Sequence, residues 1–163
     1  YQYDIDMQKV IFMLAIHELG ETVIGDLTQF QISREEKERI EHEAVQKILS
    51  GLIDGEQIER IFLEFDAHKT AEAKFAYMCD KLECDLQCKL YDEEGCVDLN
   101  DQEDNETAAN SHVKALLESE KTWSGMWLKF GQEKYPYDEN FMAVSEYAMK
   151  NTLSRCIKST TVI

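Results

Sequence analysis

The sequence has little that would interrupt regular structure, since its 163 residues include one proline and seven glycines. No segment shows the strict alternation of apolar and polar residues that is typical of a half-buried strand, and apolar residues recur instead at helical spacing. We therefore expect an all-α protein. The length is that of a single domain, residues 1–163.

Long apolar runs are also absent. No stretch approaches the 18 or more uninterrupted apolar residues that predict a transmembrane helix, and no basic segment precedes an apolar one in the manner of a secretory signal. We expect a cytoplasmic protein that does not associate with membranes.

Positive charge is scarce. The chain has 17 basic and 33 acidic residues, which leaves a net charge of -16. Such a chain repels nucleic acid polymers and anionic membranes, so we expect neither as a partner. A phosphorylated substrate would need a local cation to reverse this field.

No pair of cysteines has the Cys-x-x-Cys spacing of a zinc or redox motif, although the chain contains five cysteines. An odd number of cysteines at these spacings indicates reduced thiols in a cytosolic protein.

What is present is helical periodicity. It predicts helices over residues 4–20, 33–49, 56–65, 70–91, 107–130 and 138–157. Ser33, Thr70 and Asp138 are the expected N-caps, and Gly51 and Gly131 the expected ends. The segment 92–106 is expected to be a mobile, solvated loop because it is strongly acidic. It is not a calcium-binding EF-hand, because it lacks the glycine and the spaced oxygens of that motif.

Residues 10–28 contain the candidate site. His17 continues the apolar stripe of a helix, Glu18 follows it, and Glu21 lies one turn further on. Gly25 permits a turn that would bring Asp26 back towards the same place. Acids grouped beside an imidazole repel one another unless a cation or strong donors are present. The alternative is a hydrogen-bonded core histidine with solvated acids at a helix end.

Segment 15–28, read with segments 71–75 and 80–83, resembles the motifs of the HD-domain metal phosphohydrolases, in particular the 5'-deoxynucleotidase-like branch with its HD-x-x-E-x-x-x-GD motif. The resemblance covers most of residues 3–91 and continues more weakly to about residue 150. It implies an HD-domain helical bundle and a homodimer.

The resemblance also implies a role for each matching residue. His17, Glu18 and Asp80 would bind a divalent metal ion such as Mn²⁺, Co²⁺, Zn²⁺ or Mg²⁺, and Glu21 and Asp26 would be catalytic. The implied reaction removes the 5'-phosphate of a deoxynucleoside monophosphate, a small-molecule nucleotide substrate. By spacing alone, Asp80 would instead be a solvated or capping acid.

Two departures from the family pattern accompany this resemblance. Glu18 stands where the family has Asp, and the family's first metal-binding His, which comes from an earlier helix, has no counterpart before the motif. Because Tyr1 is not a start Met, we expect that the N-terminal helix or helices of the fold are missing from this sequence. The alternative is a catalytically impaired HD-fold protein that acts as a dimerising or regulatory module.

Other assignments fit less well. The run from His17 begins like the HExxH motif of zinc proteases, but Glu21 replaces the second His. No histidine follows a glutamate at the Glu-x-x-His spacing of di-iron bundles. Trp123 and Trp127, one turn apart, are interpreted as core residues, with a dimer surface as the alternative.

Overall fold

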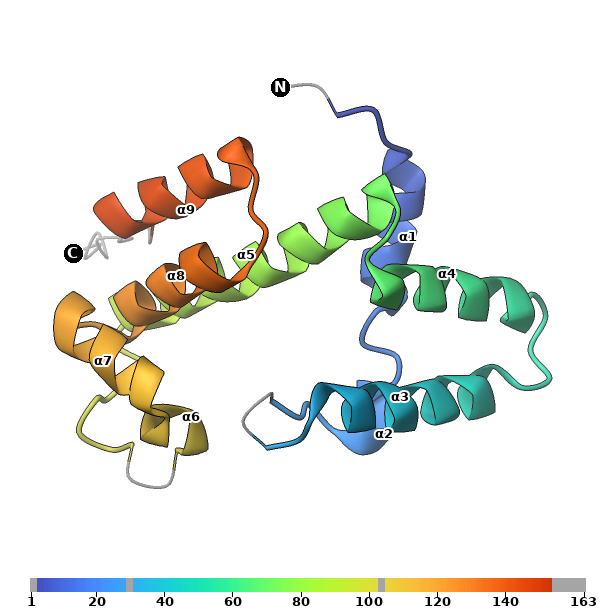
Figure 1. The fold of residues 1–163 in the computed structure, drawn as a ribbon, viewed down its shortest axis with the longest axis horizontal. Coiled ribbons are helices and arrows are strands. Elements are labelled where there is room, and N and C mark those ends of the chain that lie inside the picture. The colour runs from blue at the N-terminus through green and yellow to red at the C-terminus, as the bar shows by residue number, and fades with distance from the viewer. Residues whose placement is uncertain (1–2, 29–30, 103–104, 154–163) are drawn as a thin grey trace, which may run out of the picture. The chain divides into compact units, whose positions relative to one another are not determined.

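A computed structural model describes residues 3–28, 31–102 and 105–153 of the chain. Within these ranges the chain forms α-helices, turns and loops without a strand, which confirms the all-α class (Figure 1). None of the helices in this part of the chain is both long enough and apolar enough to cross a bilayer. The helices are α1 (Met7–Ile16), α2 (Glu21–Ile24), α3 (Arg34–Leu49), α4 (Gly55–Ala67), α5 (Ala71–Glu93), α6 (Glu106–Ala109), α7 (Ser111–Glu120), α8 (Trp123–Lys134) and α9 (Glu139–Lys150).

The chain divides into two compact units, Tyr1–Asp80 and Lys81–Ile163, and α5 contributes residues to both. Each unit has its own packed helices. The single HD-type domain expected over residues 1–163 stays a prediction.

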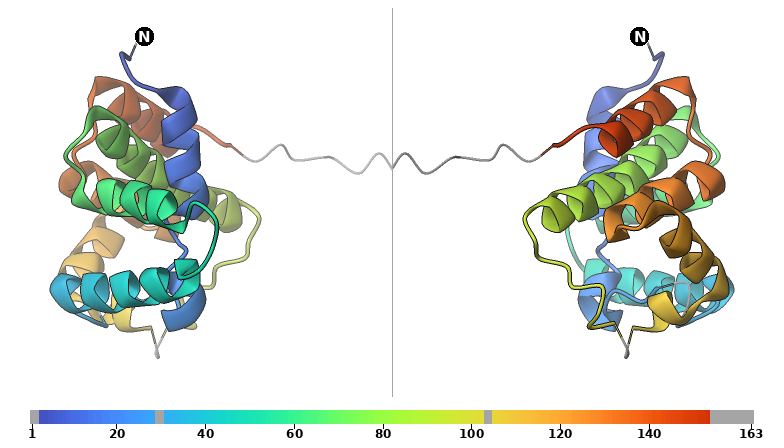
Figure 2. Two further views of the ribbon diagram at one scale, coloured as in Figure 1. Left: turned by 90° about the vertical axis from the view of Figure 1, so that its right-hand side faces the viewer. Right: turned by 90° about the vertical axis from the view of Figure 1, so that its left-hand side faces the viewer.

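In the first unit, α3 and α4 run side by side and are joined by a short turn (Figure 1). Gly51 makes this turn possible because its φ of 80° lies in the left-handed region, as expected for the residue that stops α3. Helix α1 packs against α4 (Figure 2). The main core cluster consists of Val10, Met13, Phe65, Ala73 and Ala76, and a second one of Val45, Leu49 and Phe62.

Three predicted helix starts are confirmed by their hydrogen bonds. The Ser33 side chain accepts from the backbone N–H of Glu36 at 3.3 Å, and Thr70 Oγ1 accepts from the backbone N–H of Ala73 at 3.3 Å. Asp138 caps α9 in the same way. Each cap satisfies backbone donors that have no partner within their own helix.

The prediction of one helix over residues 4–20 is wrong at both ends. Asp6 caps α1, which ends at Ile16. The chain then makes two tight turns, in which Leu19 N–H donates to Ile16 O and Glu21 N–H to Glu18 O, both at 3.0 Å. Gly20 is buried at this point, where a Cβ would lie 3.0 Å from Cβ of Glu41 on α3. The lack of a side chain at Gly20 therefore favours this close approach to α3.

The predicted helix over residues 107–130 is also wrong, because it is three helices. Asn110 stops α6 and caps α7, accepting from the backbone N–H groups of His112 and Val113. Lys121 has a left-handed φ of 65°, and Thr122 then caps α8. Gly131, expected to end a helix, lies inside α8. Helix α9 ends at Lys150, and residues 154–157 of its predicted range lie outside the described residues, as does Cys156.

In the second unit, α8 packs against both α7 and α9. Trp123 and Trp127 are half-buried on α8, with ring centroids 6.2 Å apart. The carboxyl group of Asp85 on α5 is buried, where it accepts a hydrogen bond from the Tyr137 hydroxyl at 3.1 Å. Gly131 leaves the space for this carboxyl group, since a Cβ at residue 131 would overlap its Oδ2 atom.

Candidate metal centre

His17 stands at the C-terminal end of α1, and its ring is held from two sides. Its Nδ1 atom lies 2.7 Å from the carbonyl oxygen of Leu14, one turn back on the same helix. The edge of the ring meets Phe65 of α4, with centroids 5.2 Å apart. Because a carbonyl oxygen can only accept, Nδ1 carries the hydrogen, and the lone pair of the neutral ring is on Nε2.

Two carboxylates lie close to this Nε2 atom. Asp80 Oδ1, from α5, is 3.4 Å away and Glu18 Oε1 is 3.7 Å away. Nε2 is buried and has no hydrogen-bond partner among the described residues. A lone pair and two carboxylates are all acceptors, so they repel one another unless a proton or a cation lies among them.

The electrostatics favour positive charge at this position. Burial lowers the pKa of His17, but the nearby carboxylate of Asp80, the hydrogen bond with the Leu14 carbonyl and the charge of Glu18 outweigh it, so the net pKa is raised above the ordinary value of 6.5. The site therefore stabilises either an imidazolium ion or a cation that takes its place.

These residues fit a divalent metal ion. Two ligand atoms on one tetrahedral zinc ion, each about 2.1 Å from it, are about 3.4 Å apart. The pairing of Nδ1 with a backbone carbonyl is the usual support for a histidine that binds metal through Nε2. Side chains of His17 and Asp80 are 17% and 18% exposed, but that of Glu18 is 69% exposed. Within the ranges the structure describes, no three His, Cys, Asp or Glu side chains already form a metal-binding group.

Glu21 lies in a second polar cluster. Its Oε1 atom accepts a hydrogen bond from Nζ of Lys37 on α3 at 2.8 Å, and the same Nζ is 3.5 Å from Oε1 of Glu41. Asp26 is exposed beyond Gly25, and its charge contributes to the raised pKa of Lys37. No hydrogen bond or ion pair joins Glu21 or Asp26 to His17 in the described part of the chain. The turns after Ile16 place Glu21 on α2, so the expected alignment of His17 and Glu21 on one helix is wrong.

Sequence reasoning missed the lysine of this cluster. Lys37 and Glu41 are one turn apart on α3, which marks them only as a surface ion pair. The close approach of Gly20 to Glu41 brings Glu21 to them. The side chain of His42, on the same helix, is 38% exposed, and its Nε2 atom lies 2.6 Å from Oδ2 of Asp66.

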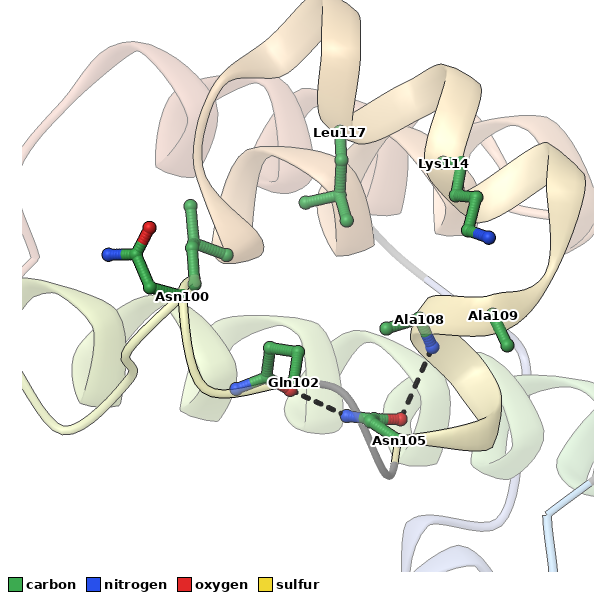
Figure 3. Close-up of a pocket in the computed structure, with 8 residues that line it drawn as sticks. Asn100, Gln102, Asn105, Ala108, Ala109, Lys114 and Leu117 are labelled. Carbon is green, nitrogen blue, oxygen red and sulfur yellow. Dashed lines mark hydrogen bonds between the residues drawn. The ribbon is translucent and has the colours of Figure 1, made fainter.

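The second unit has a cavity of about 380 Å³, drawn in Figure 3. Asn105 lines the cavity. Its side chain donates a hydrogen bond to Gln102 Oε1 at 2.7 Å and accepts one from the backbone N–H of Ala108 at 3.2 Å (Figure 3). Lys114 is the one charged residue among the described residues that line it. The cavity includes none of the predicted site residues.

The HD domain family model matches residues 1–123, so the chain belongs to the HD domain family. This assignment agrees with the resemblance found in segments 15–28, 71–75 and 80–83. No solved structure matches the chain significantly.

Curated relatives cover the same region. The 5'-deoxynucleotidase hdd1 of Schizosaccharomyces pombe is 34% identical over 95 residues, 54% of this chain and 48% of the yeast protein. The 5'-deoxynucleotidase HDDC2 of Dictyostelium discoideum is 37% identical over 95 residues, 56% of this chain and 50% of its own. Human 5'-deoxynucleotidase HDDC2 is 27% identical over 92 residues, 55% and 45% of the two chains. The chain spans about half the length of the curated relatives it matches.

Proposed function

We propose that this protein is a metal-dependent phosphohydrolase that removes the 5'-phosphate of deoxynucleoside monophosphates. The observation that carries the proposal is the buried Nε2 atom of His17, whose lone pair points towards the carboxylates of Asp80 and Glu18. Membership of the HD domain family and relatives that carry the name 5'-deoxynucleotidase support it.

In this proposal His17, Glu18 and Asp80 bind the ion, Glu18 after turning its exposed side chain inwards. Mn²⁺, Co²⁺, Zn²⁺ and Mg²⁺ are the candidates. A bound divalent ion would supply positive charge for the phosphate oxygens and lower the pKa of a water molecule. This positive charge would offset the electrostatic repulsion between a phosphate dianion and a chain of net charge -16.

The reaction is hydrolysis. A water oxygen attacks phosphorus, the bond from phosphorus to the 5'-oxygen breaks, and the proton of the water ends on the leaving alkoxide. Glu21 is the proposed carrier of that proton, because a carboxylate can accept it from water and return it to the leaving oxygen. Asp26 is proposed to help hold the water and the substrate.

The proposal also includes a homodimer and a cytoplasmic location. The dimer rests on the resemblance to the family, and sedimentation would measure it. The location rests on the cysteines, since Cys79, Cys84, Cys88 and Cys96 are free thiols among the described residues.

Phosphate release from a panel of 5'-deoxyribo- and ribonucleoside monophosphates tests the function. The protein is assayed as the cell produces it, with its N-terminus established by intact mass. It is tested with each of the four metals and with EDTA. We expect metal-dependent release that favours deoxynucleotides. Glu21→Gln should lower turnover by about 100- to 10,000-fold and leave metal bound, while Glu56→Gln, at an exposed glutamate of α4, should change neither.

One alternative remains from the sequence, a catalytically impaired HD protein that serves as a dimerising or regulatory module. The exposure of Glu18 is the observation that favours it. Metal binding without phosphate release from any nucleotide of the panel would support the module and contradict the enzyme.

A further inference from the structure

We propose that Lys37 is a positioning residue of the hydrolytic site, which holds the carboxylate of Glu21 in place while Glu41 holds Lys37. The inference rests on the proposed function, because it assigns Glu21 its catalytic role. It adds a residue that lies outside segments 15–28, 71–75 and 80–83, which carry the resemblance.

The geometry of the cluster shows that the carboxylate of Glu21 is held by Lys37. Lys37 Nζ donates to Glu21 Oε1 at 2.8 Å and lies 3.5 Å from Glu41 Oε1. The three side chains are between 14% and 25% exposed, so solvent screens their charges much less than on an open surface. An ammonium group between two carboxylates is thereby restrained from both sides.

The backbone supports this contact. Gly20 lets the turn before α2 approach Glu41 so closely that a Cβ at residue 20 would lie 3.0 Å from the Glu41 Cβ, tighter than an ordinary contact. Helix α2 has four residues and is too short to be stable alone. The Lys37 bond therefore fixes Glu21 on an element that would otherwise have few restraints.

The electrostatics of the cluster also support the pairing of Lys37 with Glu21. Burial lowers the pKa of Lys37, but the hydrogen bond to Glu21 and the charges of Glu21, Glu41 and Asp26 outweigh it, so the net pKa is raised. Glu41 has a raised pKa, chiefly through burial. The lysine therefore stays charged, and the hydrogen bond that it donates to Glu21 is charge-assisted, which makes it stronger than a bond between neutral groups.

A positioning residue and a phosphate-binding residue predict different kinetics. If Lys37 acts through Glu21, its loss lowers kcat and leaves KM nearly unchanged, because substrate binding does not use it. If Lys37 instead bound the substrate phosphate, its loss would raise KM.

The first arm of the test measures the pairing without any activity. The full chain is labelled with trace acetic anhydride, and the acetylation rate of each lysine is read by mass spectrometry. Lys37 should react several-fold more slowly than Lys47, an exposed lysine on the same helix, and Glu21→Gln should raise its rate several-fold. An unchanged rate in Glu21→Gln would overturn the pairing.

The second arm measures kinetics in Lys37→Met, Lys37→Arg and the control Lys47→Met. We expect kcat to fall by about 10- to 100-fold in Lys37→Met with KM within about twofold, partial recovery in Lys37→Arg, and no change in Lys47→Met. The double variant Lys37→Met/Glu21→Gln should be no slower than Glu21→Gln alone. A tenfold rise in KM at constant kcat, or a double variant slower than Glu21→Gln, would overturn the proposal.

The two arms separate this inference from the proposed function. Absence of phosphate release from the unaltered protein would reject the proposed function, and labelling alone would then decide whether Lys37 holds Glu21. If Lys37→Met does not fold, Glu41→Gln tests the same cluster, because loss of the second carboxylate should raise the labelling rate of Lys37. An unchanged rate in that variant would count against the proposal.

Discussion

At the scale of single residues, the proposed metal site depends on which nitrogen of His17 carries its hydrogen. The Leu14 carbonyl, 2.7 Å from Nδ1, decides this, since it can only accept. Nε2 is then left as an acceptor that faces two carboxylates. This geometry is stronger evidence for a bound cation than the mere presence of a histidine and three acids close together in the sequence.

Asp80→Asn tests the ligand assignment. We expect the affinity for Mn²⁺ to fall by at least about 100-fold, because an amide oxygen is a weaker ligand than a carboxylate. Titration calorimetry measures it directly. Asp66→Asn is the matched control, since Asp66 also pairs with a histidine of the first unit, His42, and should leave affinity unchanged. Equal affinity in Asp80→Asn and the unaltered protein would remove Asp80 from the site.

Glu18→Asp tests the residue that departs from the family motif. The Glu18 side chain is largely exposed at 3.7 Å from Nε2, and Asp is one methylene shorter. If the site is functional, we expect metal affinity and phosphate release to stay equal or rise by up to about tenfold. A loss of both would show that this site is adapted to Glu and that the family motif is a poor guide to it.

At the scale of helices, the division of the predicted helix 107–130 has one cause, the competition between local caps and helix continuation. Asn110 and Thr122 offer side-chain oxygens to backbone N–H groups, and each starts a new helix where periodicity alone predicts one long helix. Gly20 does not end a helix through its own flexibility. It lets the turn lie against Glu41, which places Glu21 beside Lys37.

The contact of α5 with Tyr137 predicts a pH-dependent stability. Burial raises the pKa of Asp85 to about 7, while the Tyr137 hydroxyl acts in the opposite direction. The folded protein therefore keeps a proton that the unfolded chain loses near its ordinary pKa of 3.8. The free energy of unfolding should fall as pH rises from about 4 to 7, by at most about 4 kcal/mol from this group.

Urea unfolding at pH 4.5, 6 and 7.5 checks this in the unaltered protein and in Asp85→Asn, which cannot titrate. The stability of the unaltered protein relative to Asp85→Asn should decrease with rising pH. Asp54→Asn, at an exposed turn, should run parallel to the unaltered protein. A pH-independent difference for Asp85→Asn would mean that Asp85 does not change its charge in this range.

At the scale of the whole molecule, the net charge of -16 opposes a phosphate substrate. This repulsion acts over the Debye length, about 30 Å at 0.01 M salt and 8 Å at 0.15 M. We expect KM for a deoxynucleoside monophosphate to fall by about two- to fivefold as sodium chloride rises from about 20 to 150 mM, with kcat unchanged. Steady-state kinetics with saturating metal measure it. A rise in KM would show that local positive charge governs substrate approach.

The sequence alone determined the helical class and several helix starts, because periodicity and caps act over a few residues. Ser33, Thr70 and Asp138 were found as caps for this reason. The family assignment by motif is likewise confirmed by the match to residues 1–123. The catalytic and metal-binding roles stay predictions.

Only the tertiary structure decided which of these residues meet. Asp80 lies 63 residues after His17 in the sequence, and the packing of α1 and α5 in one core cluster brings their carboxylate and imidazole to 3.4 Å. Lys37 reaches Glu21 across 16 residues, since Gly20 lets the chain lie against α3. Contacts of this kind depend on how apolar faces pack together, and local periodicity carries no information about the polar side chains that packing brings into contact.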